Sequence, residues 1–109
     1  MLRSDASLGI LMSRLTLEVM ATLIPTQGRA QSITLPTTGE PSLRLRTIQE
    51  LIGGYIELLP LPGGSVLILD EDGRSKKLPI NLIASQLANR QIVGTVLLCS
   101  PAELQAWDN

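Results

Sequence analysis

The chain has 109 residues, which suits one domain, and 44% of them are hydrophobic. Only Tyr55 and Trp107 are aromatic, so the core must be built from aliphatic side chains. Nine basic and ten acidic residues leave a formal net charge of −1. That balance argues against general nucleic-acid binding and against an anionic membrane as partner, because both need a basic surface.

The single cysteine, Cys99, allows no intramolecular disulfide and favours a reducing cytoplasm. No apolar run is long enough to span a membrane. We interpret residues 1–19 as a poorly ordered leader or an upstream extension, because the short apolar piece at 8–12 lies among charged residues. Residues 20–109 are then a single α+β domain.

The first elements along the chain are two strands, at residues 20–26 and 30–35, which form a hairpin around Gly28. A linker rich in Pro, Thr and Gly follows at residues 36–41. Ser42 can then cap a helix whose apolar face repeats at helical spacing through Leu45, Ile48, Leu51 and Ile52.

The helix is followed directly by Gly53 and Gly54. Gly53 stands where the residue after a helix takes a positive φ, which costs glycine little. Gly54 lets the chain reverse closely against the helix. The glycines of this pair, of Gly63-Gly64 and of Gly73 are all read as turn residues, because none has the strand, loop and helix order of a phosphate-binding loop.

Two strands follow, at residues 55–61 and 65–69, joined by Pro62-Gly63-Gly64. The second is aliphatic throughout and fits a central strand buried on both faces. Asp70, Glu71 and Asp72 then enter a turn at Gly73. We read these carboxylates as a solvated turn and not as a calcium site, since the alternating oxygen donors and distal Glu of a calcium loop are missing.

A second helix is predicted over residues 80–89, with its apolar face at Ile80, Ile83, Ala84 and Leu87. Asn81 is its candidate cap. A last strand covers residues 91–99 and bends at Gly94. Ser100-Pro101-Ala102-Glu103 is a capping box, so a short terminal helix should follow, carrying Leu104 and Trp107.

The order β-β-α-β-β-α-β, with a short C-terminal helix, predicts an α+β fold. We expect a small mixed or antiparallel sheet of about five strands with two main helices. The helices should pack against one face of that sheet.

Catalysis is not expected. The chain has no histidine, which removes the commonest general base and the usual zinc ligand, so neither a metal nor a cofactor is predicted. Cys99 ends an aliphatic strand and is interpreted as a buried structural thiol. Glu57 has no partner carboxylate in the sequence, so an enzyme acting through it is the weakest alternative.

Scattered basic residues form the only candidate ligand site, and solvated surface is the competing interpretation. If they converged, their side chains would bind an anion, with Tyr55 or Trp107 offering a stacking face. Asn81 could address a base or ribose, although capping is its default role. The candidate ligand-binding residues are Arg44, Arg46, Tyr55, Arg74, Lys76, Lys77 and Asn81.

The string Gly53-Gly54-Tyr55-Ile56-Glu57 resembles an uncharacterised domain family common in phages, prophages and plasmids. The resemblance covers Met20 to Cys99 and continues in Leu51-Ile52, Val66-Leu67-Ile68-Leu69-Asp70, Glu71-Asp72-Gly73-Arg74, Leu78-Pro79-Ile80-Asn81, Ala84-Ser85 and Ile92-Val93-Gly94-Thr95-Val96-Leu97. Members are similar in size to Thoeris anti-defence proteins, which sequester cyclic ADP-ribose signals without cleaving them.

The resemblance implies a non-enzymatic binding protein that sequesters a small anionic nucleotide immune signal, with its pocket at a homo-oligomer interface. It also implies that the cytoplasm is that of a bacterial host cell. An alternative is a protein–protein interaction module that inhibits or accompanies a host or plasmid DNA-processing enzyme. Such a module would need an exposed aliphatic face and no small-molecule pocket.

Overall fold

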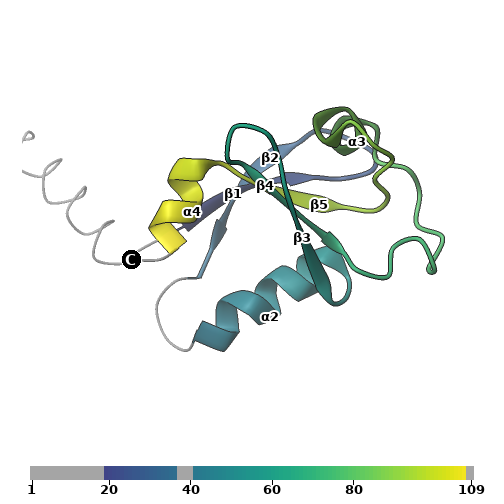
Figure 1. The fold of residues 1–109 in the computed structure, drawn as a ribbon. Coiled ribbons are helices and arrows are strands. Elements are labelled where there is room, and N and C mark those ends of the chain that lie inside the picture. The colour runs from purple at the N-terminus through teal and green to yellow at the C-terminus, as the bar shows by residue number, and fades with distance from the viewer. Residues whose placement is uncertain (1–18, 37–40, 108–109) are drawn as a thin grey trace, which may run out of the picture.

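A computed structural model describes residues 19–36 and 41–107, and the side chains of residues 41, 42, 106 and 107 are not described. The described residues fold as one five-stranded sheet with three helices (Figure 1). The elements are β1 (Val19–Ile24), β2 (Gln31–Leu35), α2 (Pro41–Ile52), β3 (Ile56–Pro60), β4 (Val66–Asp70), α3 (Leu82–Ala88), β5 (Val96–Cys99) and α4 (Pro101–Trp107). None of the helices among the described residues has the length and hydrophobicity to cross a bilayer.

The sheet is antiparallel throughout and has the strand order β2-β1-β5-β4-β3. Two hairpins, β1–β2 and β3–β4, form its two halves, and β5 joins them by pairing with both β1 and β4. The β1–β2 connection contains Gly28 at a φ of +93°, as the predicted hairpin requires. The α+β class and the order of elements are therefore confirmed.

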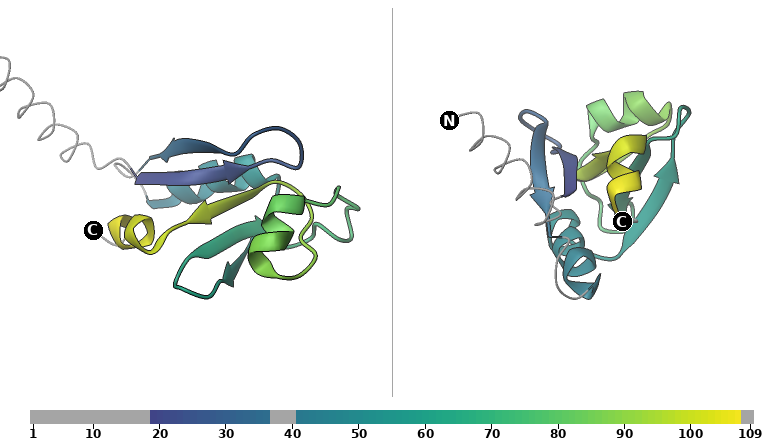
Figure 2. Two further views of the ribbon diagram at one scale, coloured as in Figure 1. Left: turned by 90° about the horizontal axis from the view of Figure 1, so that it is seen from above. Right: turned by 90° about the vertical axis from the view of Figure 1, so that its left-hand side faces the viewer.

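The main helices lie on opposite faces of the sheet, so the expectation that they share one face is wrong. Figure 2 (right) shows α2 and α3 on either side of the strands. The reason lies in β4 and β5, where the consecutive side chains at 66–69 and at 96–99 are apolar, so both faces of the sheet need cover. Alternate residues accordingly feed two separate core clusters, with Ile68 in one and Leu67 and Leu69 in the other.

The α2 face is closed by Ile48 and Ile52, which are buried against β1, β4 and β5. Two other members of the predicted apolar face, Leu45 and Leu51, lie at its margin and are exposed. The helix begins at Pro41, so Ser42 lies in the first turn and is not the residue before it. Proline suits that first helical position because its missing N–H would have no partner there.

The α3 face is covered by smaller side chains than predicted. Only Ala84 is fully buried on α3, and Ala88 packs against the same cluster. Ile80, Ile83 and Leu87 are exposed, so the predicted apolar face is wrong for these three residues and confirmed for Ala84 alone. Two alanines one turn apart let the helix approach the sheet closely, and the larger residues are left beside the contact.

The C-terminal helix begins as the capping box predicted. The backbone N–H of Ser100 donates to Glu103 Oε1 over 2.9 Å, and the N–H of Glu103 donates to Ser100 Oγ over 3.1 Å. Leu104 packs against the α2-side core. Residues 1–18 of the expected leader lie outside the described part of the chain, whereas Val19 already belongs to β1 and is buried.

Candidate functional site

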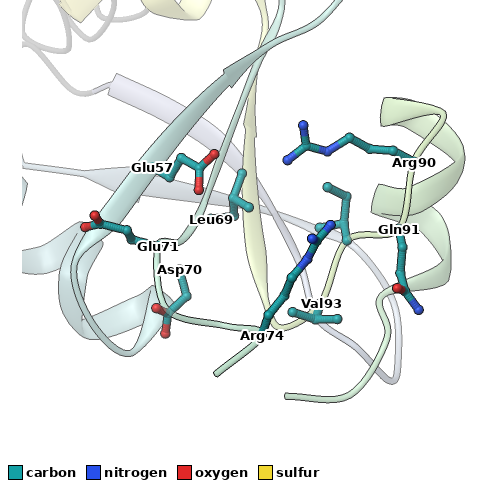
Figure 3. Close-up of a pocket in the computed structure, with 9 residues that line it drawn as sticks. Glu57, Leu69, Asp70, Glu71, Arg74, Arg90, Gln91 and Val93 are labelled. Carbon is teal, nitrogen blue, oxygen red and sulfur yellow. The ribbon is translucent and has the colours of Figure 1, made fainter. Parts of the chain in front are cut away.

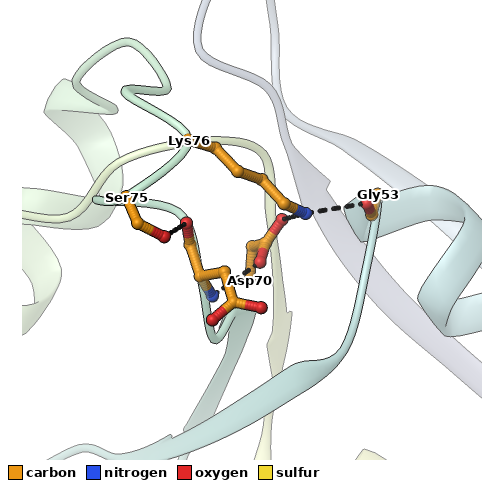
Figure 4. A network of polar contacts seen from close by, with 5 residues as sticks. Gly53, Asp70, Ser75 and Lys76 are labelled. Carbon is orange, nitrogen blue, oxygen red and sulfur yellow. Dashed lines mark hydrogen bonds and ion pairs between the residues drawn. The ribbon is translucent and has the colours of Figure 1, made fainter.

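The turn that follows β4 is organised by Asp70, whose side chain is buried. Its Oδ1 accepts from the backbone N–H of Asp72 over 2.8 Å, and its Oδ2 accepts from Lys76 Nζ over 2.7 Å. The sequence predicted that Asp70, Glu71 and Asp72 form a solvated turn. That prediction is wrong for Asp70, whereas Glu71 and Asp72 are exposed. The ion pair closes the turn and brings the chain at 71–77 over the end of α2 (Figure 4).

Lys76 also ties this turn to the C-terminus of α2. Its ammonium donates to the carbonyl of Gly53 over 3.1 Å, where the negative end of the helix dipole favours a cation. Gly53 has a φ of +100°, which confirms its predicted role in ending the helix. A Cβ on Gly54 would lie 2.6 Å from Lys76 Nζ, so the close contact at this glycine is with the Lys76–Asp70 pair and not, as the sequence suggested, with the helix.

On the other face, α3 and the segment that follows it are held together by Asn81 and Ser85. Asn81 is 1% exposed, and its Oδ1 accepts from the N–H of Ala84, which confirms the capping role. Its Nδ2 donates to the carbonyls of Ile24 and Gly94, each over 2.9 Å. Ser85 Oγ accepts from the N–H of Ile92 over 2.8 Å. These bonds fix the segment at 90–94 as a wall beside the sheet.

Asn89 ends α3 in the left-handed conformation, with a φ of 55°. The N–H of the next residue, Arg90, bonds to the carbonyl of Ser85 over 3.2 Å, which is the usual closure of a helix C-terminus. The turn thereby directs the Arg90 side chain away from the helix and toward the strands (Figure 3). The last strand is shorter than predicted because Gly94, at a φ of +82°, separates β5 from the bridge between Ile80 and Val93.

Between this wall and the ends of β3 and β4 lies a cavity of about 350 Å³. Apolar side chains from β4 and the 90–94 segment line part of it, and charged side chains surround them. Figure 3 shows the guanidinium groups of Arg74 and Arg90 extending into this space and the carboxylate of Glu57 pointing back from β3. The lining residues are Glu57, Leu69, Asp70, Glu71, Arg74, Arg90, Gln91, Ile92 and Val93.

The charges of this cavity are not compensated inside the fold. Within residues 19–36 and 41–107, neither guanidinium has an ion pair or a hydrogen bond, and the Glu57 carboxylate has none either. Asp70 is bound to Lys76 on the other side of its strand, and Figure 3 shows Glu71 directed away from the cavity. Two cations therefore face one carboxylate, and the cavity favours an anionic group.

A second hollow, of about 340 Å³, lies on the α2 side of the same turn. It brings together two predicted site residues, Tyr55 and Lys76, beside Gln49, Gly54 and Asp72. Tyr55 is 70% exposed and offers a flat face to solvent. The Lys76 ammonium, however, is already neutralised by Asp70 and bonded to Gly53, so this hollow presents no uncompensated cation.

The seven predicted ligand residues do not form one site. Arg44 is half-buried and Arg46 exposed on α2, and Lys77 is exposed in the turn with a φ of 57°. Asn81 is enclosed, and every polar group of its side chain is bonded within the fold, so it is not placed to read a ligand. Of the predicted residues, Arg74 alone lines the charged cavity.

A family model described as a domain of unknown function, DUF3846, matches residues 20–106. The chain belongs to the DUF3846 family. In the same comparisons no curated protein and no solved structure matches the chain. The match covers both main helices and all five strands apart from Val19, so the cavity lies wholly inside the DUF3846 domain.

Two charged residues that line the cavity of this DUF3846 domain, Arg90 and Glu57, were not among the predicted ligand-binding residues. Arg90 and Arg74 are separated by a turn, a helix and a helix end, and only the fold brings them to one cavity. Glu57 was considered only as a lone catalytic carboxylate. The signal that could have found Arg90 is local, because a helix ending at Asn89 must place the next side chain outside the helix.

Cys99 is fully buried, and burial raises the pKa of its thiol to about 12, with the negative charge of Glu103 as the smaller cause. Its predicted structural role is confirmed. No group of three His, Cys, Asp or Glu side chains in the described part of the chain is arranged to hold a metal ion. The Trp107 side chain, the other predicted stacking face, lies outside the described residues.

Proposed function

We propose that this protein binds a small anionic nucleotide in the cavity between Arg74 and Arg90 and releases it unchanged. The observation that carries the proposal is the pair of guanidinium groups that face one cavity without partners among the described residues. A fold gains nothing from holding two like charges together, whereas a phosphate between them would make charge-assisted, bidentate hydrogen bonds.

The rest of the cavity suits the remainder of a nucleotide. Its volume of about 350 Å³ falls within the range of about 300–1,000 Å³ that is common for small-molecule sites. Leu69, Ile92 and Val93 supply apolar surface for a base or a sugar. A homo-oligomer, as the resemblance in the sequence implies, is compatible with binding in this cavity.

Sequestration rather than turnover is the proposed outcome because the chain contains no histidine and its single thiol is buried and protonated. The anti-defence role, in which a phage-type protein withholds an immune nucleotide from its host receptor, comes from the resemblance in the sequence. No contact in the cavity carries this anti-defence role. A panel of ligands that includes immune nucleotides tests it separately from the binding of an anion.

The test is a thermal-shift and calorimetric screen of the full chain against mononucleotides, cyclic dinucleotides and cyclic ADP-ribose isomers. We expect saturable binding that Arg74→Ala weakens by about tenfold or more, because a charge-assisted pair contributes about 1.5–3 kcal/mol. Arg46→Ala is the matched control, since Arg46 is exposed on α2 and lies outside the cavity. The ligand should be recovered intact after denaturation.

Three results would count against the proposal. Silence across the whole panel would remove it, and equal losses in the Arg74 and Arg46 variants would move the site out of the cavity. Recovery of a cleaved ligand would replace sequestration with catalysis.

A protein–protein interaction module is a second candidate function, favoured by the surface of α3. Ile80, Leu82, Ile83 and Leu87 are exposed together, and Leu82 is 72% exposed. The stretch from residue 78 to residue 89 carries no charge, which is unusual for a helix facing solvent. A second copy of the chain, or a host or plasmid DNA-processing enzyme, could cover this surface.

Leu82→Glu separates these occupants because it charges the exposed surface without touching either core cluster. If a second copy covers α3, sedimentation velocity should show a dimer that the variant converts to a monomer. A wild-type monomer at all concentrations would leave a different protein as the only occupant of this candidate function. Unchanged self-association in the variant would place any dimer on another surface.

A further inference from the structure

The carboxylate of Glu57 is the feature of the cavity that phosphate binding does not explain. It lies on β3, opposite the segment that carries Arg90, and Figure 3 shows it pointing into the space between the strands and Arg90. A carboxylate repels a phosphate, so Glu57 must face a different part of the ligand. That part has to present hydrogen-bond donors, because an ionised carboxylate only accepts.

We infer that the cavity selects guanine nucleotides, with Glu57 accepting from the N1–H and the N2 amino group of the base. The inference rests on the proposed function, since it assumes that Arg74 and Arg90 hold the phosphate. Guanine is the common base whose Watson–Crick edge carries two adjacent donors, and the two oxygens of a carboxylate lie side by side to accept from both.

The other common bases fit this carboxylate poorly. Adenine and cytosine each place a ring-nitrogen acceptor beside their amino group, and that lone pair would face a negatively charged oxygen. Uracil has a single N–H between two carbonyl oxygens. A site that hydrogen-bonds a donor discriminates strongly against a ligand that lacks it, because its own polar group is then left unpaired.

The surroundings of Glu57 support a flat, partly apolar ligand over a simple amine. Its cross-strand neighbour Leu69 lines the same cavity, and Ile92 and Val93 lie there as well. A planar base can cover these side chains while its edge reaches the carboxylate. A small ammonium compound would leave most of the cavity of about 350 Å³ unfilled.

The inference is tested by calorimetric titration of the full chain with 5′-GMP, 5′-IMP and 5′-AMP. IMP lacks only the N2 amino group and so removes one of the two proposed hydrogen bonds from the ligand side. We expect GMP to bind at least about tenfold more tightly than AMP, with IMP between them. Equal affinities, or a preference for AMP, would overturn the guanine assignment.

Glu57→Gln makes the test specific to this residue. An amide presents one acceptor and one donor, which matches the edge of adenine and mismatches that of guanine. The variant should therefore bind GMP about tenfold more weakly and AMP more tightly, a change of opposite sign for two ligands of nearly equal size. Glu57→Asp, which keeps both oxygens, should retain the order GMP, IMP, AMP. A shift of both affinities in the same direction in Glu57→Gln would overturn the role of Glu57.

The two proposals fail in distinguishable ways. Binding of all three nucleotides with equal affinity, but lost in Arg74→Ala, keeps the anionic site and removes the guanine preference. No binding by any of the three removes the guanine assignment, and the proposed function falls with it only if the wider panel of cyclic dinucleotides and cyclic ADP-ribose isomers is silent as well. Thermal melting of each variant in buffer confirms that the fold is intact before affinities are compared.

Discussion

The two faces of the sheet treat their charged residues in opposite ways. On the α2 face the single ammonium near the helix end, that of Lys76, is paired with buried Asp70 and bonded to the Gly53 carbonyl. On the α3 face two guanidinium groups and one carboxylate surround a cavity that is similar in volume to the hollow on the α2 side. These three charged groups have no partner in the described part of the chain. The α2 face pairs its cation within the fold, whereas the charged side chains around the α3-side cavity have no partner among the described residues, and the proposed function assigns them to a ligand.

The comparison teaches that a basic residue near a cavity is evidence for a site only when the fold has not already used its charge. Lys76 and Arg74 are two positions apart in one turn and are equally attractive in the sequence. The difference between them is set by Asp70, which faces α2 because β4 alternates its side chains between the faces.

Asp70→Asn should have the largest effect on stability, because Asp70 is the residue that distinguishes Lys76 from Arg74. It removes the charge that neutralises the partly exposed Lys76, and it weakens the acceptor for the N–H of Asp72, at a side chain that is itself buried. We expect the free energy of unfolding to fall by about 2–4 kcal/mol. Chemical denaturation measures it, with Asp72→Asn as the control, because that carboxylate is exposed. Equal losses in the two variants would mean that the turn does not depend on Asp70.

A pH series tests whether the α2-side core excludes water. The thiol of Cys99, which belongs to that core, has a folded pKa of about 12 against an ordinary value of 9.0. The folded state therefore keeps a proton that the unfolded chain releases, so the stability is complete below pH 9 and is lost as pH rises toward 12. The slope should be about 1.4 kcal/mol per pH unit in that window.

Cys99→Ala isolates the contribution of this thiol. The stability of the wild type should fall faster than that of the variant between pH 9 and 12, although the variant is less stable at pH 7 because of the volume it loses. Parallel curves would show that the thiol is not protected by the core.

Gly54→Ala should lower the free energy of unfolding by less than Asp70→Asn, and it also acts on the α2 face. The new Cβ would lie 2.6 Å from Lys76 Nζ and 3.3 Å from Asp70 Oδ2, so the ammonium must move and the ion pair lengthens. We expect a loss of about 1–2 kcal/mol by denaturation. In a Lys76→Ala background the same substitution should cost less, since the clash is then absent. Equal costs in both backgrounds would place the effect in the backbone.

Local chemistry in the sequence predicts much of this fold. Gly53 at the end of α2, Asn81 as a helix cap and the Ser100–Glu103 box each depend on neighbours within a few residues, and all three are confirmed. The apolar alternation of strands likewise predicts the sheet. Such features are readable because the interacting groups are close along the chain.

Features that depend on distant segments were not predictable. The face that α3 turns to the sheet is fixed by Asn81, which bonds to carbonyls 57 and 13 residues away, and not by the largest apolar side chains of the helix. The pairing of Lys76 with Asp70, and the meeting of Arg74 with Arg90, require the completed sheet. The sequence therefore predicted the chemistry of the candidate site, a set of cations for an anion. It did not predict which residues line the cavity, apart from Arg74.

The most direct test of the account compares cations from the two faces in one experiment. Calorimetric titrations of 5′-GMP and 5′-AMP would use the wild type, an Arg74→Ala/Arg90→Ala variant and Lys76→Ala, each shown to be folded. We predict that the double arginine variant loses about 100-fold or more in affinity for the better ligand, whereas Lys76→Ala, although less stable, stays within about threefold of the wild type. Affinity retained without the arginines, or lost without Lys76, would contradict the assignment of the site to the α3 face.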